Sequence, residues 1–300
     1  MEADRPGESS PDQDMLARFD TSVPHPARVY DAWLGGKDNF AADRAAAEAG
    51  QQAFPAVAES VRANRAFLAR TVEYLAAEAG IRQFLDIGTG LPSADNTHEV
   101  AQAVATESRV VYVDNDPIVL RHAEALLIGK APGTTAYIDA DLRDPDKILA
   151  EAARTLDFCQ PVAIMLLAVL HFVSDEQDPY EIVNTLLDAV PAGSYLVASH
   201  TAKDIRPEQV APFIQVLNRG LSDKSVSRDR AEVARFFRGL ELVEPGVVNI
   251  SEWRPRPGTD AEPAILWGAV ARKPRLPRGD PADRGFLRAG GDPPSQRGFP

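Results

Sequence analysis

Apolar and polar positions alternate in a regular order along the middle of the chain. Short apolar runs at 83–87, 109–114 and 161–170 are each followed by longer segments in which apolar residues recur every three or four positions. The first pattern is typical of buried strands, and the second is typical of helices that pack one face against them. This alternation predicts an α/β fold with a doubly wound, Rossmann-like sheet.

The same pattern predicts the individual elements. We expect strands at 83–87, 109–114, 135–139, 161–170 and 194–200, and helices at 55–79, 96–105, 117–128, 145–156, 179–190, 207–218 and 230–237. Two late apolar segments, 240–250 and 264–272, are joined by a proline-rich loop without a helical pattern. Because no crossover helix separates them, we expect an antiparallel C-terminal hairpin.

The composition divides the chain into four parts. Residues 1–20 are polar and acidic, and residues 274–300 are rich in proline, glycine and arginine, so we expect both to be disordered. Residues 81–273 carry the strand and helix alternation and form the predicted core. Residues 21–80 precede it as a helical N-terminal extension, which we interpret as a lid or cap.

Charge and cysteine content narrow the class of protein. A net charge of −12, without a lysine- or arginine-rich run, argues against nucleic-acid binding. Cys159 is the only cysteine and the five histidines are scattered, so we expect neither an internal disulfide nor a metal site. Since no apolar run reaches transmembrane length and no leader pattern is present, we expect no membrane association and a cytoplasmic location.

The segment FLDIGTGLPSADN, at 84–96, carries the strongest functional signal. One acid, Asp86, lies in an apolar strand, and Gly88 and Gly90 form the turn after it. Glycine tolerates positive φ and lets a ligand approach the backbone. A dinucleotide fingerprint needs a third glycine, where this chain has Ser93. An acid at position 86 would repel a pyrophosphate but suits a ligand with an amino group and a sulfonium. The alternative is that Asp86 caps nearby backbone amides.

The next predicted strand, 109–114, ends in Asp114. A glycine turn after one strand and a carboxylate at the tip of the next is an arrangement that holds a nucleoside at the edge of a parallel sheet. The two motifs together predict an adenosine-type cofactor, and the acid before the first glycine favours S-adenosylmethionine over NAD.

The order of glycine turn, strand-end acid, apolar fourth strand and terminal hairpin resembles the class I S-adenosylmethionine-dependent methyltransferases. More narrowly, ARVYDAWLGGKDNFAADR (27–44), FLDIGTGLPSADNTHEVA (84–101) and FFRGLELVEPGVV (236–248) resemble an actinobacterial family of uncharacterised candidate methyltransferases. The resemblance covers 24–273. It implies a seven-stranded sheet with an antiparallel last strand and S-adenosylmethionine at the carboxyl ends of the strands. It implies no particular substrate.

The resemblance also implies roles for single residues. Asp86, Gly88 and Gly90 would face the methionine end of the cofactor, and Asp114 would accept both ribose hydroxyls.

Residues further along would surround the adenine. Asn115 or Asp116 would lie beside the ring. Asp141 would accept from the exocyclic amine, and Leu142 would donate a backbone amide. Helix capping is the alternative for Asp141, and also for Asp144 just before Pro145 at the start of the next helix.

Two histidines are candidates for the chemistry. His171 follows the fourth apolar run, where the resemblance places groups near the methyl, and its imidazole suits a general base. Equally, it could only line the pocket. His200 is a weaker candidate of the same kind. The segment around His171 lacks the asparagine-proline-proline-aromatic signature of base-amino methyltransferases, which argues against a DNA amine as substrate.

The N-terminal segment RVYDAWLGGKDNF combines aromatic and polar residues around two glycines. We interpret Tyr30, Gly35, Gly36 and Asn39 as parts of a lid that excludes water and shapes the substrate pocket. The alternative is a helix that packs its aromatic residues on the sheet and ends at the glycines. Asn64 and Arg65, on the helix before the first strand, could reach the same pocket, but we expect them to be ordinary helix-face residues.

The predicted function is methyl transfer from S-adenosylmethionine to a small-molecule acceptor, with oxygen and nitrogen both open as the methylated atom. Two alternatives remain from the sequence. One is a non-catalytic protein that binds S-adenosylmethionine or its demethylated product and passes that state to a partner. The other is an NAD-dependent oxidoreductase. The oligomeric state does not follow from the sequence.

Overall fold

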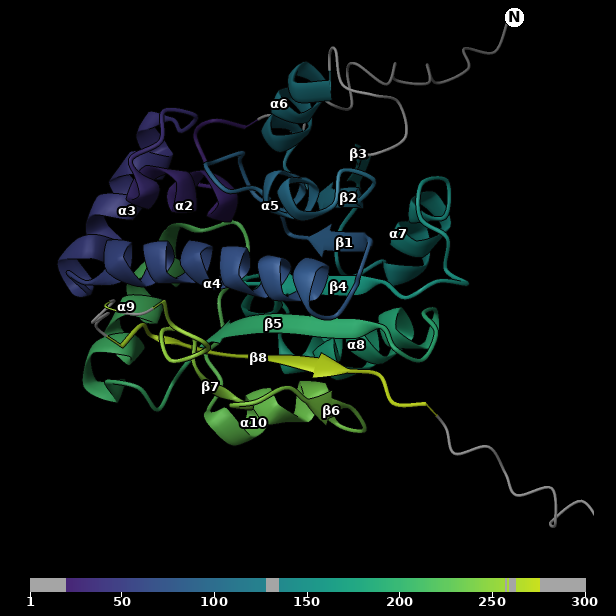
Figure 1. The fold of residues 1–300 in the computed structure, drawn as a ribbon. Coiled ribbons are helices and arrows are strands. Elements are labelled where there is room, and N and C mark those ends of the chain that lie inside the picture. The colour runs from purple at the N-terminus through teal and green to yellow at the C-terminus, as the bar shows by residue number, and fades with distance from the viewer. Residues whose placement is uncertain (1–19, 128–134, 257, 259–262, 276–300) are drawn as a thin grey trace, which may run out of the picture.

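The computed structural model describes residues 20–127, 135–256, 258 and 263–275. Helices cover both faces of a twisted sheet, and the first helices gather at one end of it (Figure 1). Apart from their inner ends, the two segments expected to be disordered, 1–20 and 274–300, lie outside the described residues. The division of the rest into 21–80 and 81–273 stays a prediction.

The described strands form one sheet in the order β3-β2-β1-β4-β5-β8-β6, and β7 also pairs with β8. The strands are β1 (Gln83–Ile87), β2 (Arg109–Asp114), β3 (Thr135–Asp139), β4 (Ala163–Leu167), β5 (Tyr195–Thr201), β6 (Glu241–Leu242), β7 (Val248–Asn249) and β8 (Leu266–Arg272). Strands β1 to β5 are parallel, and β8 is antiparallel to β5. The doubly wound α/β fold is therefore confirmed.

The C-terminal hairpin differs from the prediction in one detail. The segment 240–250 forms two short strands, β6 and β7, and both pair antiparallel with β8. A turn separates them, in which the N–H of Gly246 (φ 87°) donates to the carbonyl of Val243 at 2.9 Å. Within the described residues the sheet therefore has eight strands and not the seven implied by the resemblance, because this turn interrupts one strand.

The helices begin where the sequence places caps and prolines. Asp144 and Asp178 accept from backbone amides in the first turns of their helices, and a proline follows each of them. Capping, one of the two interpretations of Asp144, is thus its structural role. The α-helices are α2 (Pro26–Leu34), α3 (Ala41–Ala53), α4 (Val57–Ala77), α5 (Thr97–Val104), α6 (Pro117–Leu127), α7 (Pro145–Ala152), α8 (Pro179–Asp188), α9 (Pro207–Gly220) and α10 (Arg230–Ala234).

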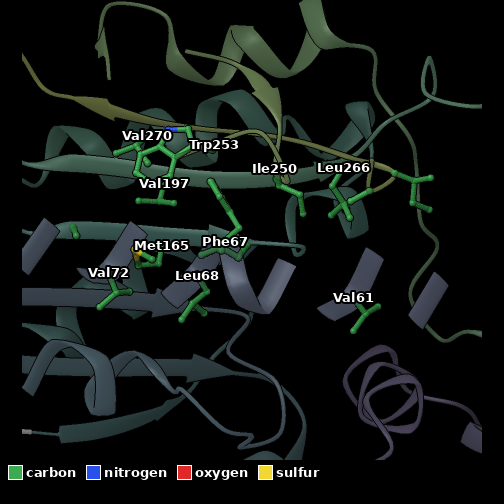
Figure 2. Packing of buried hydrophobic residues seen from close by; sticks show 14 of the residues in the cluster. Val61, Phe67, Leu68, Val72, Met165, Val197, Ile250, Trp253, Leu266 and Val270 are labelled. Atoms are coloured by element: carbon green, nitrogen blue, oxygen red, sulfur yellow. The ribbon is translucent and has the colours of Figure 1, made fainter. Parts of the chain in front are cut away.

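Alternate residues of each central strand face two separate apolar cores. Phe84 of β1 and Met165 of β4 face α4, whereas Leu85 and Ile164 face α7 and α8. Figure 2 shows Phe67, Leu68 and Val72 of α4 beside Met165 and Val197 of the sheet. A strand that is apolar on both faces suits a parallel sheet with helices on either side.

The N-terminal helices pack at the end of α4 where the parallel strands have their carboxyl ends (Figure 1). Trp33 of α2 and Phe54 after α3 both contact Phe213 of α9, with ring centroids 5.9 and 5.8 Å apart. Segments far apart in the sequence therefore pack together at the carboxyl ends of the strands.

Candidate active site at the carboxyl edge of the sheet

The carboxyl ends of β1, β2 and β4 meet where the strand order reverses. Strand β1 pairs with β2 on one side and with β4 on the other. In open α/β sheets, ligands bind in the crevice outside such a switch point. A cavity opens there, lined by the loops after β1, β2, β3 and β4 and by residues of α2, α4 and α9.

The turn after β1 holds two glycines in the left-handed region. Gly88 has a φ of 74° and Gly90 a φ of 67°. The N–H of Gly88 donates to the carbonyl of Val113 at the end of β2 (2.8 Å). A side chain at Gly88 would collide with Val169, whereas one at Gly90 would meet no described atom within 4 Å. Gly88 therefore serves the packing of the turn, and Gly90 leaves its backbone open to a ligand.

Asp114, at the end of β2, lies against this turn. Its Oδ2 accepts the N–H of Gly90 at 2.8 Å, and its Oδ1 accepts the N–H of Asp116 at 3.0 Å. Burial raises the pKa of Asp114, and the two backbone amides oppose that effect. Each oxygen keeps acceptor capacity beyond its amide partner. The carboxylate can therefore accept a pair of hydroxyl groups from a ligand in the cavity.

Asp86, in β1, is the second buried carboxylate of the cavity. Its Oδ2 accepts from the hydroxyl of Thr97 at 2.6 Å. Burial raises the pKa of Asp86 to about 6, and Arg65 is among the groups that oppose this rise. Among the described residues its hydrogen-bond partner is this side chain, and not the backbone amides that the capping alternative requires. At neutral pH, Asp86 presents a negative charge to the cavity.

Asn115 and Asp141 join the loops after β2 and β3. The amide of Asn115 donates to Asp141 Oδ2 at 3.0 Å, and the guanidinium of Arg143 lies 2.8 Å from the same oxygen. Arg143 is also paired with Asp223 at 2.7 Å. Leu142 is buried and lines the cavity with these groups. The side chain of Asp141 is therefore held in place at the cavity wall.

His171 lies in a short 3₁₀ turn, Leu170–Phe172, after β4 and lines the cavity. Its Nδ1 is 3.3 Å from Oγ1 of Thr201. Burial lowers the pKa of His171 to about 3, and Arg228 contributes in the same direction, so the imidazole is neutral at physiological pH. His200 is absent from the cavity lining, and its Nε2 accepts from Arg228 at 2.7 Å.

A chain of hydrogen bonds connects the N-terminal extension to the end of β4. The hydroxyl of Tyr30 accepts from Asn64 (3.1 Å), and the amide oxygen of Asn64 accepts from Ser199 Oγ (2.6 Å). Ser199 Oγ in turn accepts the N–H of Ala168 (2.9 Å), which has a φ of 53°. Asn64 is 4% exposed and lines the cavity, so it is not the ordinary helix-face residue that we expected.

Comparisons with known proteins identify the family. A family model described as S-adenosyl methyltransferase matches residues 12–274. The chain belongs to this family. A solved structure of a DUF574 family protein from Streptomyces avermitilis is 47% identical, covering 85% of this chain and 99% of that chain, with a TM-score of 0.81. A candidate methyltransferase from Thermobifida fusca is 42% identical, covering 89% of this chain and 100% of that chain, with a TM-score of 0.80. No curated protein matches.

The protein is thus an S-adenosylmethionine-dependent methyltransferase, and the resemblance drawn from its motifs is confirmed. This result leaves the NAD-dependent oxidoreductase alternative without support. The site fits the cofactor on two structural grounds. The space that a side chain at Gly90 would occupy holds no described protein atom, so a ligand can approach the backbone there. Beside it, the carboxylate of Asp114 can accept further hydrogen bonds.

The four predicted lid residues of the methyltransferase lie in two places. Tyr30 lines the cavity, whereas Gly35, Gly36 and Asn39 form the turn after α2. Gly35 (φ 79°) caps α2, and a side chain at Gly36 would collide with Asp31. The amide of Asn39 donates to Asp31 at 2.8 Å. These three residues therefore fix the path of the chain between α2 and α3.

Charged side chains also connect the N-terminal extension to the loop after β2. His25 Nδ1 and Arg28 Nε each lie 3.1 Å from Oδ2 of Asp116. The other oxygen of Asp116 accepts the N–H of Ile118 at 2.9 Å, as expected for the cap of α6. Asp116, one of the two residues expected beside the adenine, is therefore occupied by protein groups. No local pattern in the sequence indicated this contact.

Two further findings concern only the described residues. No group of three or more histidine, cysteine, aspartate or glutamate side chains is placed to hold a metal ion. No helix there is both long enough and apolar enough to cross a bilayer.

Proposed function

We propose that this methyltransferase methylates a small molecule that binds beneath α2, beside the end of β4. The observation that carries the proposal is the extent of the cavity. It continues from the Asp114 and Gly90 edge to the side chains of Tyr30, Trp33 and Phe213, within the fold. An acceptor there is enclosed by protein, which excludes water and fixes its orientation, and this is the main requirement for an in-line displacement.

The cofactor supplies a methyl group on a positively charged sulfur. We expect Asp114 to accept both ribose hydroxyls, because its two oxygens are oriented by Gly90 and Asp116 and retain acceptor capacity. Gly88 and Gly90 would place open backbone along the methionine portion. Asp86 would face the positively charged amino group, because it is a buried carboxylate in the strand that leads into the same turn.

The adenine would lie between the loops after β2 and β3. Asn115 holds the carboxylate of Asp141, and Arg143 pairs with it as well. A carboxylate in a fixed position is suited to accept from the exocyclic amine, while the backbone of Leu142 would complete the contact. Both loops line the cavity, which supports this arrangement.

His171 is the proposed proton acceptor. Its pKa of about 3 makes it a weak base toward a free alcohol or amine. The proton of the acceptor becomes far more acidic as the new bond to carbon forms, so a weakly basic imidazole is sufficient at that stage. His171 would then hold this proton while Thr201 orients the ring through Nδ1.

Binding and transfer test the proposal in sequence. Calorimetric titration should show micromolar binding of S-adenosylmethionine and of its demethylated product, and no binding of NAD. The protein is then incubated with methyl-labelled cofactor and three fractions of an actinobacterial lysate: small molecules, nucleic acids and proteins. We expect the label in the small-molecule fraction.

Other outcomes are equally informative. Label in a macromolecular fraction would overturn the acceptor class. Binding without transfer to any fraction would favour the non-catalytic alternative. The variant His171→Gln keeps a polar side chain but cannot accept a proton, so it should bind the demethylated product normally and transfer methyl about 100-fold more slowly. Equal rates would leave His171 as a lining residue only.

A further inference from the structure

The cavity has two halves of different chemistry. The half under α2 and α9, named here the apolar half, is lined by Trp33, Val61, Phe213, Ile214, Leu217 and Leu266. Val61 and Leu266, from α4 and β8, belong to the same hydrophobic cluster and are both labelled in Figure 2. The cofactor half, in contrast, is lined by the loops after β1, β2 and β3.

None of the residues named for the apolar half is charged, and the charged side chains of the cavity lie outside that half. Asp86 is bonded to Thr97, and Arg65 donates to the backbone carbonyl of Ala94 at 3.0 Å. Asp223, three residues after the end of α9, also lines the cavity, but its carboxylate pairs with Arg143. A charged acceptor in the apolar half would therefore be buried without a counter-charge, which is strongly unfavourable.

Neutral polar groups stand where the two halves meet. The hydroxyl of Tyr30 and the amide of Asn64 are bonded to each other, and the second bond of Asn64 goes to Ser199. His171 has its Nδ1 beside Thr201, and in the described part of the chain Nε2 has no hydrogen-bond partner. This neutral imidazole, at the wall of the cavity, is available to one polar group of a ligand.

We propose that the methyl acceptor is an uncharged, largely apolar molecule that places one hydroxyl group beside His171. The apolar half encloses its carbon skeleton, and the hydroxyl bonds to Nε2. In the transfer, an oxygen lone pair forms the bond to the methyl carbon, and the carbon–sulfur electron pair passes to sulfur, which becomes neutral. The hydroxyl proton passes to Nε2. This inference rests on the proposed function and specifies its acceptor.

Three probes of one size test the charge preference. The full chain, saturated with the demethylated cofactor product, is titrated with 2-naphthol, 2-naphthoate and 2-naphthylmethylammonium at pH 7.5. We expect 2-naphthol to bind at least tenfold more tightly than either charged probe. Equal or tighter binding of a charged probe, or no binding of 2-naphthol, would overturn the inference.

A charge placed in the apolar half should reverse the ranking. Ile214 of α9 is partly buried and lines this half, so Ile214→Lys should bind 2-naphthoate at least tenfold more tightly than the wild type does. The matched control is Gln215→Lys, which adds the same charge at an exposed position of the same helix and should keep the wild-type ranking. An unchanged ranking in Ile214→Lys would contradict the location of the site.

The titration of the demethylated product itself separates the two hypotheses. If this product binds but the probes show no preference for the neutral one, the acceptor inference fails and the proposed function stands. If the product does not bind, the proposed function fails, whatever the probes show.

Discussion

The two halves of the cavity offer a ligand contacts of different physical kinds. In the cofactor half, backbone amides hold Asp114 in a fixed orientation, and Gly90 exposes its own backbone. In the apolar half, side chains such as Phe213 and Leu217 provide shape and no charge. Directional hydrogen bonds suit the recognition of one fixed cofactor. The shape of an apolar pocket, in contrast, can be altered by replacing single side chains, so that it accepts a different ligand. Substitutions in the apolar half should therefore change the acceptor while cofactor binding persists.

The largest effect is expected where the cofactor half is open. Gly90→Val would fill the space in front of the turn and force a β-branched residue into φ 67°. We expect the affinity for the demethylated cofactor product to fall at least 100-fold, which corresponds to about 3 kcal/mol. Isothermal titration calorimetry measures this change.

A matched control separates the effect of backbone strain from the effect of filling the cavity. Gly80 has a φ of 71° and equally open surroundings, but it lies between α4 and β1, away from the cavity. Gly80→Val should lower thermal stability by an amount similar to Gly90→Val and leave binding unchanged. A Gly90→Val protein that binds as tightly as wild type would mean that no ligand occupies the turn.

The second largest effect concerns the carboxylate beside that turn. Asp114→Ala removes an ionised acceptor and leaves the N–H of Gly90 without its partner. The loss of a charged hydrogen bond costs about 1.5–3 kcal/mol, so affinity should fall roughly 10- to 100-fold. Asp144→Ala, which removes the cap of α7, should reduce stability by about 1 kcal/mol without affecting binding. Unchanged affinity in Asp114→Ala would remove this residue from the site.

The cofactor half was the more predictable one because its geometry is local. Gly88, Gly90 and Asp114 each follow directly from a strand and a turn that the hydrophobic pattern marks. The first residues of most strands and helices were equally accessible, since they depend on period, caps and prolines. The interruption of the segment 240–250 was missed, although Pro245 and Gly246 are residues typical of a turn.

The polar contacts that join the N-terminal extension to the cavity were not predictable, for a physical reason. Asn64 is bonded to Ser199, 135 positions away in the sequence, and to Tyr30, 34 positions away. Only the packing of α2 and α4 against the end of the sheet brings these groups together. The contact of Arg28 with Asp116 depends on the same packing. Such pairs leave no period or motif in a single sequence.

A smaller effect is expected from the histidine between the two halves. The pKa of His171 is about 3 in the folded protein and 6.5 in a solvated side chain, so the unfolded state binds the proton first as pH falls. Stability is therefore lost between pH 6.5 and 3, by about 1.4 kcal/mol per pH unit. Between pH 7.5 and 5, His171→Gln should lose about 2 kcal/mol less stability than wild type in urea titrations. An equal loss in both proteins would mean that His171 is not buried in its neutral form.

The smallest expected effect comes from the ionisation of Asp86 in the cofactor half. Burial raises the pKa of Asp86 from 3.8 to about 6, so this carboxylate takes up a proton as pH falls through 6. In the proposed site, an ionised Asp86 attracts the amino group of the cofactor. Affinity for the demethylated product should therefore fall by up to about tenfold per pH unit below pH 6, which is about 1.4 kcal/mol. Calorimetry at pH 7, 6 and 5 measures the slope.

Asp86→Asn provides the comparison for that slope. The folded-state pKa of Asp86 is raised, so its ionisation disfavours folding at pH 7, and an uncharged amide there should not reduce thermal stability. The variant should bind the product more weakly at pH 7 and with little dependence on pH. If the slope of the variant matches that of wild type, the titrating group is not Asp86. Asp114, whose pKa is also raised by burial, would then be the carboxylate that controls binding, and the amino group of the cofactor would need a different partner.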